Sequence, residues 1–115
     1  MRSPSLLRSV FALLLLLLAP LVKAQNASTG RVSGLVNDAQ SAAIKGASVI
    51  IVEGATRTVR STKTNETGRY DFPNVEPGTY DLTVDSPGFS TARLSSQKVD
   101  VCMALTLNVR LEVGR

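Results

Sequence analysis

The chain has 115 residues, with 13 Lys or Arg, 9 Asp or Glu, one Cys, and neither His nor Trp. That length suffices for one small domain and excludes a two-domain enzyme. Without His, and with a single Cys, the chain lacks the residues of the most common proton shuttles and metal sites. Three basic residues lie in the first 24 positions, so the remainder has 10 basic and 9 acidic side chains. This near balance gives no charge footprint for nucleic acid.

The first 24 residues have the pattern of a signal peptide. Arg2 and Arg8 supply positive charge, an apolar run follows over residues 10–19, and a small residue, Ala24, precedes Gln25. We therefore predict export of the chain and cleavage between Ala24 and Gln25. An uncleaved membrane anchor is the alternative, but the apolar run is about half the ~20 residues that a spanning helix needs. The mature chain is predicted to contain no integral membrane span.

Short strands are predicted along the rest of the chain. Residues 25–29 are small and polar and are predicted to form a flexible lead-in. From Gly30 onward, brief runs alternate apolar and polar residues and are interrupted by turn signals, which is typical of strands. The predicted strands cover residues 31–37, 47–53, 56–64, 69–72, 80–84 and 89–96, with a terminal hairpin over 99–101 and 104–113. About seven strands without helical periodicity predict an all-β, antiparallel β-sandwich over residues 30–115.

Aromatic and glycine residues define the predicted core and turns. Tyr70, Phe72 and Tyr80 share the core-facing parity, and each ring can bury roughly 150–250 Å². Gly34, inside a strand, is predicted to leave space for a neighbouring ring or for close approach of a backbone. Turn positions are predicted at four residues, with Gly78 at the positive φ of a type II turn; they are Gly68, Pro77, Gly78 and Gly88.

Several of these segments together resemble the carboxypeptidase regulatory-like domain family, whose fold is a transthyretin-like (prealbumin-like) β-sandwich. The most specific part is Gly68-Arg69-Tyr70-Asp71-Phe72 followed by Pro77-Gly78-Thr79-Tyr80, and the similarity covers nearly all of the chain after the leader. The segments are GRVSGLVND (30–38), KGASVIIVE (45–53), TNETGRYDFPNVEPGTYDLTV (64–84), SPGF (86–89) and LTLNVRLEVG (105–114).

The sequence is similar in particular to the copies at the N-terminus of bacterial TonB-dependent outer-membrane receptors, which also follow a signal peptide. The resemblance implies a location in the periplasm or at the outer membrane, with secretion as the alternative. In those receptors a plug and a barrel follow, whereas this sequence stops at Arg115. We therefore expect either a free-standing module or a receptor fragment, with an envelope protein as its partner.

No enzymatic activity, cofactor or metal is predicted. The Ser and Thr residues have no His to activate them, and the lone Cys has no partner base. Carbohydrate binding, by a module of starch-binding-like fold, is the alternative to a protein-interaction role. A sugar site needs exposed rings, and Phe89 is the one aromatic residue outside the core parity. We expect Phe89 to pack on the core. If the domain does bind a sugar, Phe89 is the candidate ligand contact.

Cys102 lies between the two predicted terminal strands, so we expect a turn position with at least partial exposure. In an oxidising compartment a lone exposed thiol forms a disulfide-linked dimer or a small-thiol adduct, or remains a free thiol. The alternative is a buried Cys that serves as a small apolar residue.

Overall fold

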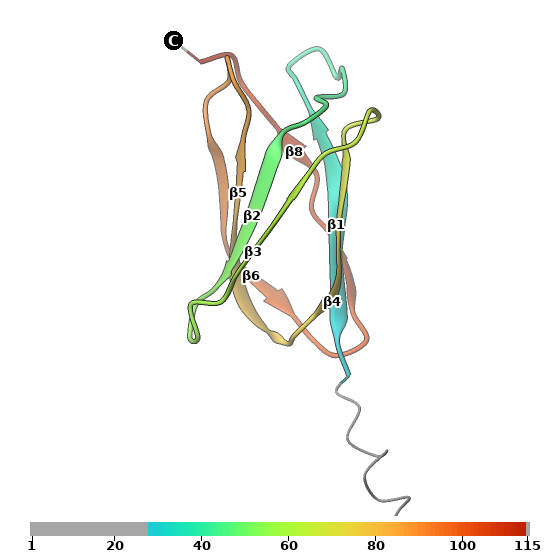
Figure 1. Ribbon diagram of the computed structural model, residues 1–115, viewed down its shortest axis with the longest axis vertical. Coiled ribbons are helices and arrows are strands. Elements are labelled where there is room, and N and C mark those ends of the chain that lie inside the picture. Colours follow the sequence, from blue (N-terminus) through green and yellow to red (C-terminus); the bar gives the residue numbers. More distant parts are fainter. Residues whose placement is uncertain (1–27, 115) are drawn as a thin grey trace, which may run out of the picture.

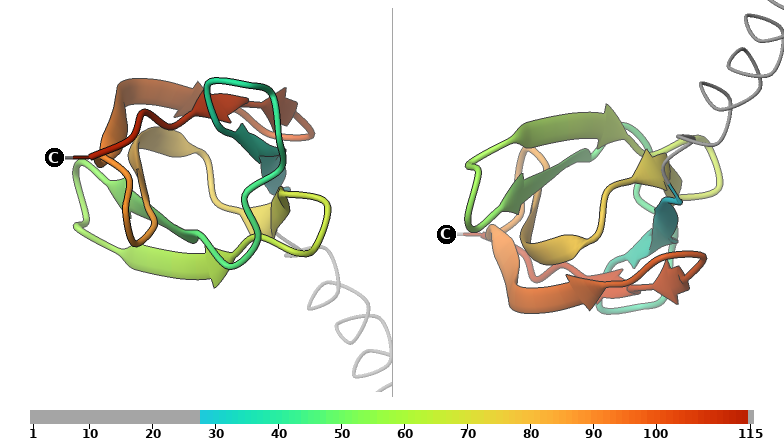
Figure 2. Two further views of the ribbon diagram at one scale, coloured as in Figure 1. Left: turned by 90° about the horizontal axis from the view of Figure 1, so that it is seen from above. Right: turned by 90° about the horizontal axis from the view of Figure 1, so that it is seen from below.

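The computed structural model of the chain describes residues 28–114, and two sheets face each other around one core (Figures 1 and 2). The predicted signal peptide, its cleavage site and most of the lead-in lie outside the described residues. The strands, in chain order, are β1 (Gly30–Asn37), β2 (Ser48–Glu53), β3 (Val59–Lys63), β4 (Arg69–Val75), β5 (Gly78–Asp85), β6 (Ala92–Val99), β7 (Ala104–Thr106) and β8 (Val109–Arg110).

One sheet, here called the β1 sheet, has the order β4-β1-β7, and β8 also pairs with β1. The other, the β2 sheet, has the order β3-β2-β5-β6, with antiparallel neighbours throughout. The prediction of an all-β sandwich is confirmed. No helix in residues 28–114 has the length and hydropathy needed to cross a membrane.

The core lies between the sheets and follows the strand parity. Alternate side chains point inward, which gives period-two burial in β1, β2, β4 and β5. Phe72 and Tyr70 meet edge to face, with ring centroids 6.1 Å apart. The buried apolar residues are Val32, Val36, Ile44, Ala47, Val49, Ile51, Tyr70, Phe72, Val75, Tyr80, Leu82, Val84, Val99, Val109 and Leu111.

At Gly34, β1 and the C-terminal segment approach each other closely. A Cβ placed there would lie 2.0 Å from the Leu107 carbonyl oxygen and 2.9 Å from the Tyr70 hydroxyl oxygen. The Tyr70 hydroxyl donates a hydrogen bond of 2.5 Å to that same carbonyl. Burial raises the pKa of Tyr70 to about 12, so the phenol keeps its proton at neutral pH. Gly34 therefore leaves space for the Leu107 backbone, which the hydrogen bond from Tyr70 holds in place.

The predicted terminal hairpin is wrong. The chain turns at residues 100–103, leaves the β2 sheet, and places β7 and β8 parallel to β1 in the other sheet. The inward parity of Leu105, Leu107, Val109 and Leu111 holds, whereas Val113 is 71% exposed. Parity fixes which face of a strand is buried, but not which neighbour the strand takes.

The turn predicted at Pro77–Gly78 also differs. Gly78 is the first residue of β5 and does not have the positive φ that the third position of a type II turn requires. The residue is small for another reason: a Cβ would lie 2.9 Å from Oε1 and 3.0 Å from Cγ of Glu53. Gly68 and Gly88, by contrast, have φ of 75° and 84°.

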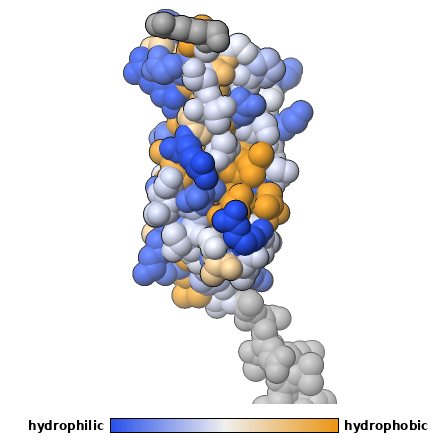
Figure 3. Space-filling view, turned by 90° about the vertical axis from the view of Figure 1, so that its left-hand side faces the viewer, coloured by the Kyte–Doolittle hydropathy of each residue, from blue (hydrophilic) through white to orange (hydrophobic). Residues whose placement is uncertain are grey.

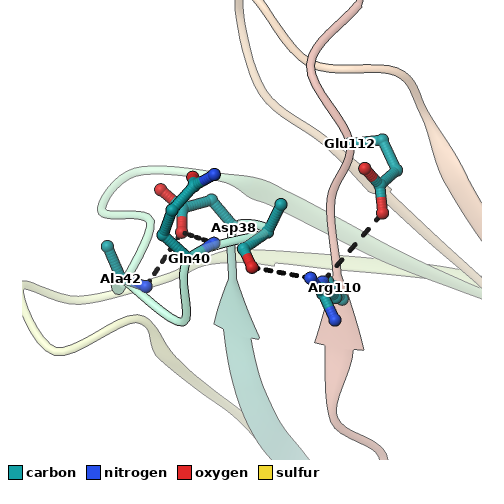
Figure 4. A network of polar contacts seen from close by, with 6 residues as sticks. Asp38, Gln40, Ala42, Arg110 and Glu112 are labelled. Carbon is teal, nitrogen blue, oxygen red and sulfur yellow. Dashed lines mark hydrogen bonds and ion pairs between the residues drawn. The ribbon is translucent and has the colours of Figure 1, made fainter.

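The upper end of the sandwich in Figure 1 is closed by hydrogen-bonded loops. Asp38 Oδ1 accepts the amides of Gln40 and Ala42, each at 2.9 Å, and Arg110 Nη2 donates to the Ala39 carbonyl at 2.6 Å (Figure 4). Glu112 lies 4.0 Å from Arg110 Nε. These contacts fasten the β1–β2 loop to β8.

Candidate functional site

A hollow lies at the opposite end of the sandwich, where the β2–β3 loop faces the β4–β5 connection. Its volume is about 690 Å³, within the range of small-ligand sites. We call it the main cleft. Its walls are Glu53, Ala55, Thr56, Thr58, Arg60, Asn74, Glu76, Pro77 and Tyr80.

Glu53, the last residue of β2, is held in place by its own loop. Its Oε2 accepts the Thr56 amide at 2.5 Å and the Thr56 hydroxyl at 2.8 Å. The amide, and then the hydroxyl, hold the pKa of the Glu53 carboxyl below its usual value. Oε1 lies over Gly78 on β5. The carboxylate is therefore ionised at neutral pH and fixed in orientation.

Arg60 joins the two sheets at the back of the cleft. It lies on edge strand β3, and its guanidinium carbon is 5.6 Å from the centroid of the Phe72 ring on β4. Arg60 Nη1 also donates to the Asn74 carbonyl at 3.1 Å. A cation on a ring face and a hydrogen bond together fix the side chain. The strand predicted over residues 56–64 is present as β3, over Val59–Lys63, at the edge of its sheet. Arg60 on this strand also covers an aromatic ring.

Tyr80 forms the floor of the cleft. It is 6% exposed, and its hydroxyl donates to the Glu76 carbonyl at 2.7 Å. Burial, followed by the charges of Glu53 and Glu76, raises the pKa of Tyr80, while Arg60 acts in the opposite direction. Each of the two acids therefore acts on this hydroxyl more strongly than Arg60 does.

A second hollow of about 280 Å³ adjoins the first at Asn74. Its other walls come from the start of β1 and from the β6–β7 turn, where Val101 is 55% and Met103 37% exposed. Its lining is Thr29, Gly30, Arg31, Pro73, Asn74, Cys102, Met103 and Ala104. Two hollows thus lie side by side at one end of the domain, and each is lined by both polar and apolar surface.

The structure separates the residues singled out from the sequence into three places. Pro77, Gly78 and Tyr80 lie at the main cleft, and Cys102 lies at the second hollow. Gly34, Tyr70 and Phe72 belong to the core. The remaining three lie at the other end of the sandwich, and they are Gly68, Gly88 and Phe89.

Phe89 is half-buried and packs against the core, and its backbone forms a bridge with Val113. It lies beyond the Asp85 end of β5, whereas the main cleft lies at the Gly78 end. The candidate sugar-contacting ring and the main cleft are therefore at opposite ends of the domain.

Cys102 is exposed in the β6–β7 turn with φ of 56°. We expect native protein to react completely with a maleimide within minutes, because nothing has to unfold to expose the thiol. The check is intact mass before and after adding denaturant, with Cys102→Ser as the unreactive control. The same protein, oxidised without reductant, is expected to give a dimer band that reductant removes. Labelling only after denaturation would contradict both expectations.

Sequence reasoning missed most of the cleft. Glu53, Arg60, Asn74 and Glu76 belong to three separate segments, and no short motif joins them. Two local signals were present in the sequence: an acid that ends an apolar strand, and an Asn before a turn, which here has φ of 54°. Within residues 28–114 no three His, Cys, Asp or Glu side chains gather to hold a metal ion.

The outer face of the β2 sheet carries a small group of apolar side chains. Val59 on β3, 60% exposed, pairs with Val52 on β2, and Ile50 follows on the same face. Figure 3 views this side of the molecule and shows apolar residues grouped among charged ones. Asp81 crosses this face to accept the Ser96 amide at 3.0 Å and lies 3.6 Å from Arg93.

Comparison with known families places the described domain. The sequence model of the carboxypeptidase regulatory-like domain matches residues 31–112. A comparison with curated proteins finds no match to this chain.

Solved structures share the fold. A candidate carbohydrate-binding protein from Bacteroides uniformis has a TM-score of 0.61 at 15% identity, over 74% of this chain and 42% of that one. A cohesin–X–dockerin complex from Acetivibrio cellulolyticus has a TM-score of 0.58 at 23% identity, over 74% of this chain and 58% of that one. Catechol 1,2-dioxygenase from Acinetobacter radioresistens has a TM-score of 0.57 at 14% identity, over 81% of this chain and 54% of that one. The chain spans about half of each of these longer chains, and at such identity the likeness extends to the fold alone.

Proposed function

The chain belongs to the carboxypeptidase regulatory-like domain family, and from that premise we propose that it is an exported, non-catalytic accessory module of the bacterial envelope that binds a protein partner. We further propose that it corresponds to the N-terminal extension of a TonB-dependent outer-membrane receptor, either free-standing or as a piece of one. The pattern of residues 1–24 supports export.

The observation that carries the binding role is the construction of one end of the sandwich. Two loops and a turn surround adjoining hollows of about 690 and 280 Å³ there. The loops stand on a two-sheet core, and their charged groups are oriented by hydrogen bonds before any partner arrives. Loops held on a rigid scaffold are a common location for binding sites.

Export is tested on the protein expressed in a bacterial host. We expect the chain in the periplasmic or outer-membrane fraction, with an intact mass that begins at Gln25, allowing for conversion of Gln25 to pyroglutamate. An Ala24→Arg variant should retain its leader, because the cleavage site requires a small residue at that position. A wild-type chain found in the cytoplasm with residues 1–24 still attached would contradict the proposed location.

The receptor origin is tested separately, on the gene. A reading frame for a plug and barrel downstream of codon 115, in frame or after a single frameshift, is the expected result for an extension or a fragment. Unrelated sequence there would leave the free-standing module as the remaining form of the proposal.

Carbohydrate binding is the second candidate, and the fold shared with the candidate carbohydrate-binding protein from Bacteroides uniformis supports it. Hydroxyl, carboxylate and guanidinium groups in the main cleft could hydrogen-bond a sugar. Against it, no ring in the cleft is open for stacking, since Arg60 covers Phe72 and Tyr80 is 6% exposed. Protein binding therefore remains the preferred role.

A further inference from the structure

We propose that the main cleft binds a basic side chain, Lys or Arg, from an extended segment of a partner polypeptide. This inference deepens the accessory binding role proposed above and rests on it. It names the site on the domain and the chemistry that the site recognises.

Charge is the first argument. Glu53 and Glu76 stand on facing walls of the cleft, and none of the four ion pairs in residues 28–114 includes either acid. Arg60, the only base in the lining, is already engaged with the Phe72 ring and the Asn74 carbonyl. Two carboxylates are thus available to an incoming cation, which can form charge-assisted hydrogen bonds with them.

Preorganisation is the second argument. Thr56 holds Glu53 Oε2 through two hydrogen bonds, and Thr58 in turn lies 2.9 Å from the Thr56 hydroxyl. The other oxygen, Oε1, lies over Gly78, and the amides of Ala55 and Thr79 also lower the pKa of this carboxyl. A carboxylate fixed in this way loses little conformational freedom when a ligand binds.

The shape of the lining fits a long basic side chain. Ala55, Pro77 and the buried ring of Tyr80 contribute apolar surface beside the two acids. Lys and Arg carry an apolar stem below a charged head, and they bury the stem where the head meets polar groups. A small inorganic cation would use the carboxylates and leave this apolar surface uncovered.

The second hollow points to a polypeptide. Asn74 lines both hollows, so a segment that places a side chain in the main cleft can continue across Asn74. Beyond it lies Met103, an apolar residue that is 37% exposed and lines the second hollow. A free organic cation would fill the first hollow alone, whereas a polypeptide can place a basic side chain in one and an apolar side chain in the other.

The probe is the pentapeptide acetyl-Leu-Ala-Lys-Ala-Leu-amide, compared with the same peptide carrying norleucine in place of Lys. Each is titrated into the purified, nitrogen-15-labelled chain, and amide shifts are followed by NMR. We expect saturable shifts at Thr56, Thr58 and Gly78, with smaller ones at Met103, for the Lys peptide. The norleucine peptide should give no saturation, because it keeps the stem and lacks the charge.

Charge-neutral variants locate the site. Glu53→Gln and Glu76→Gln should each raise the dissociation constant of the Lys peptide by about three- to fivefold, as expected for the loss of a partly exposed ion pair. Glu76→Gln retains the backbone carbonyl that accepts from Tyr80, so it reports on charge with the fold unchanged. Glu66→Gln, an equal change of charge at the other end with an 83% exposed side chain, should leave binding unchanged.

Three results would overturn the proposal. Equal binding of the Lys and norleucine peptides would exclude charge recognition. Binding of n-butylammonium as tight as that of the Lys peptide would exclude a polypeptide as the ligand. Saturable shifts with maltotriose or cellotriose, and none with the Lys peptide, would promote the carbohydrate role. These outcomes are distinct from failure of the export proposal, which the leader mass and cell fractionation decide without reference to peptide binding.

Discussion

Gly34→Ala is expected to destabilise the domain by about 3 kcal/mol or more, a large part of the stability of a small domain. The new methyl carbon would lie 2.0 Å from a backbone carbonyl oxygen, that of Leu107. The Tyr70 hydroxyl holds this carbonyl, so relief requires β7 and β8 to move away from β1 and to loosen that hydrogen bond. Urea unfolding followed by tyrosine fluorescence measures the loss.

Gly54→Ala is the matched control, because its new Cβ would meet nothing closer than the Thr79 carbonyl at 3.6 Å. We expect its free energy of unfolding to change by less than about 1 kcal/mol, with the sign set by the reduced freedom of the unfolded chain. Equal urea midpoints for the two variants would show that β1 and the C-terminal segment do not approach each other as described.

Phe72→Ala is expected to cost about 3–5 kcal/mol. The ring is 2% exposed, meets Tyr70 edge to face, and supports the guanidinium of Arg60 from the neighbouring sheet. Its removal leaves a cavity and withdraws the surface on which Arg60 lies. The measurement is again the free energy of unfolding in urea.

Thr83→Ala is the control for that variant. Thr83 lies on the outer face of β5, pairs with Ile50 on β2, and has no side-chain hydrogen bond among those described. Its replacement should change the free energy of unfolding by about 0.5 kcal/mol or less. If both variants unfold at the same urea concentration, then Phe72 is not part of the core.

Gly34→Ala and Phe72→Ala act at different positions in one continuous series of contacts. Gly34 admits the Leu107 backbone, Tyr70 fastens that backbone, and Phe72 packs on Tyr70. Arg60 then continues from Phe72 to the wall of the main cleft. The orientation of the cleft therefore depends on the packing of the core, and Phe72→Ala should also broaden the amide signals of Thr56 and Thr58.

The sequence by itself determined most of the strands, the faces that they bury, and the family. Alternation with period two states which side chains share a face, so the pattern alone assigns Tyr70, Phe72 and Tyr80 to the core. Glycine at Gly68 and Gly88 could be assigned to turns because positive φ is a local requirement. These are properties of a residue and its immediate neighbours, and local pattern is enough to reveal them.

Only the tertiary structure decided which strands are neighbours and which loops meet. The inward parity of Leu105 to Leu111 is the same in a hairpin with residues 99–101 as in the parallel arrangement beside β1. The small size of Gly78 reflects a side chain 25 positions earlier, Glu53. The main cleft joins Glu53, Arg60 and Glu76 from separate segments. Contacts of this kind depend on how two sheets pack, because the period-two pattern of a strand carries no information about the residues across the core.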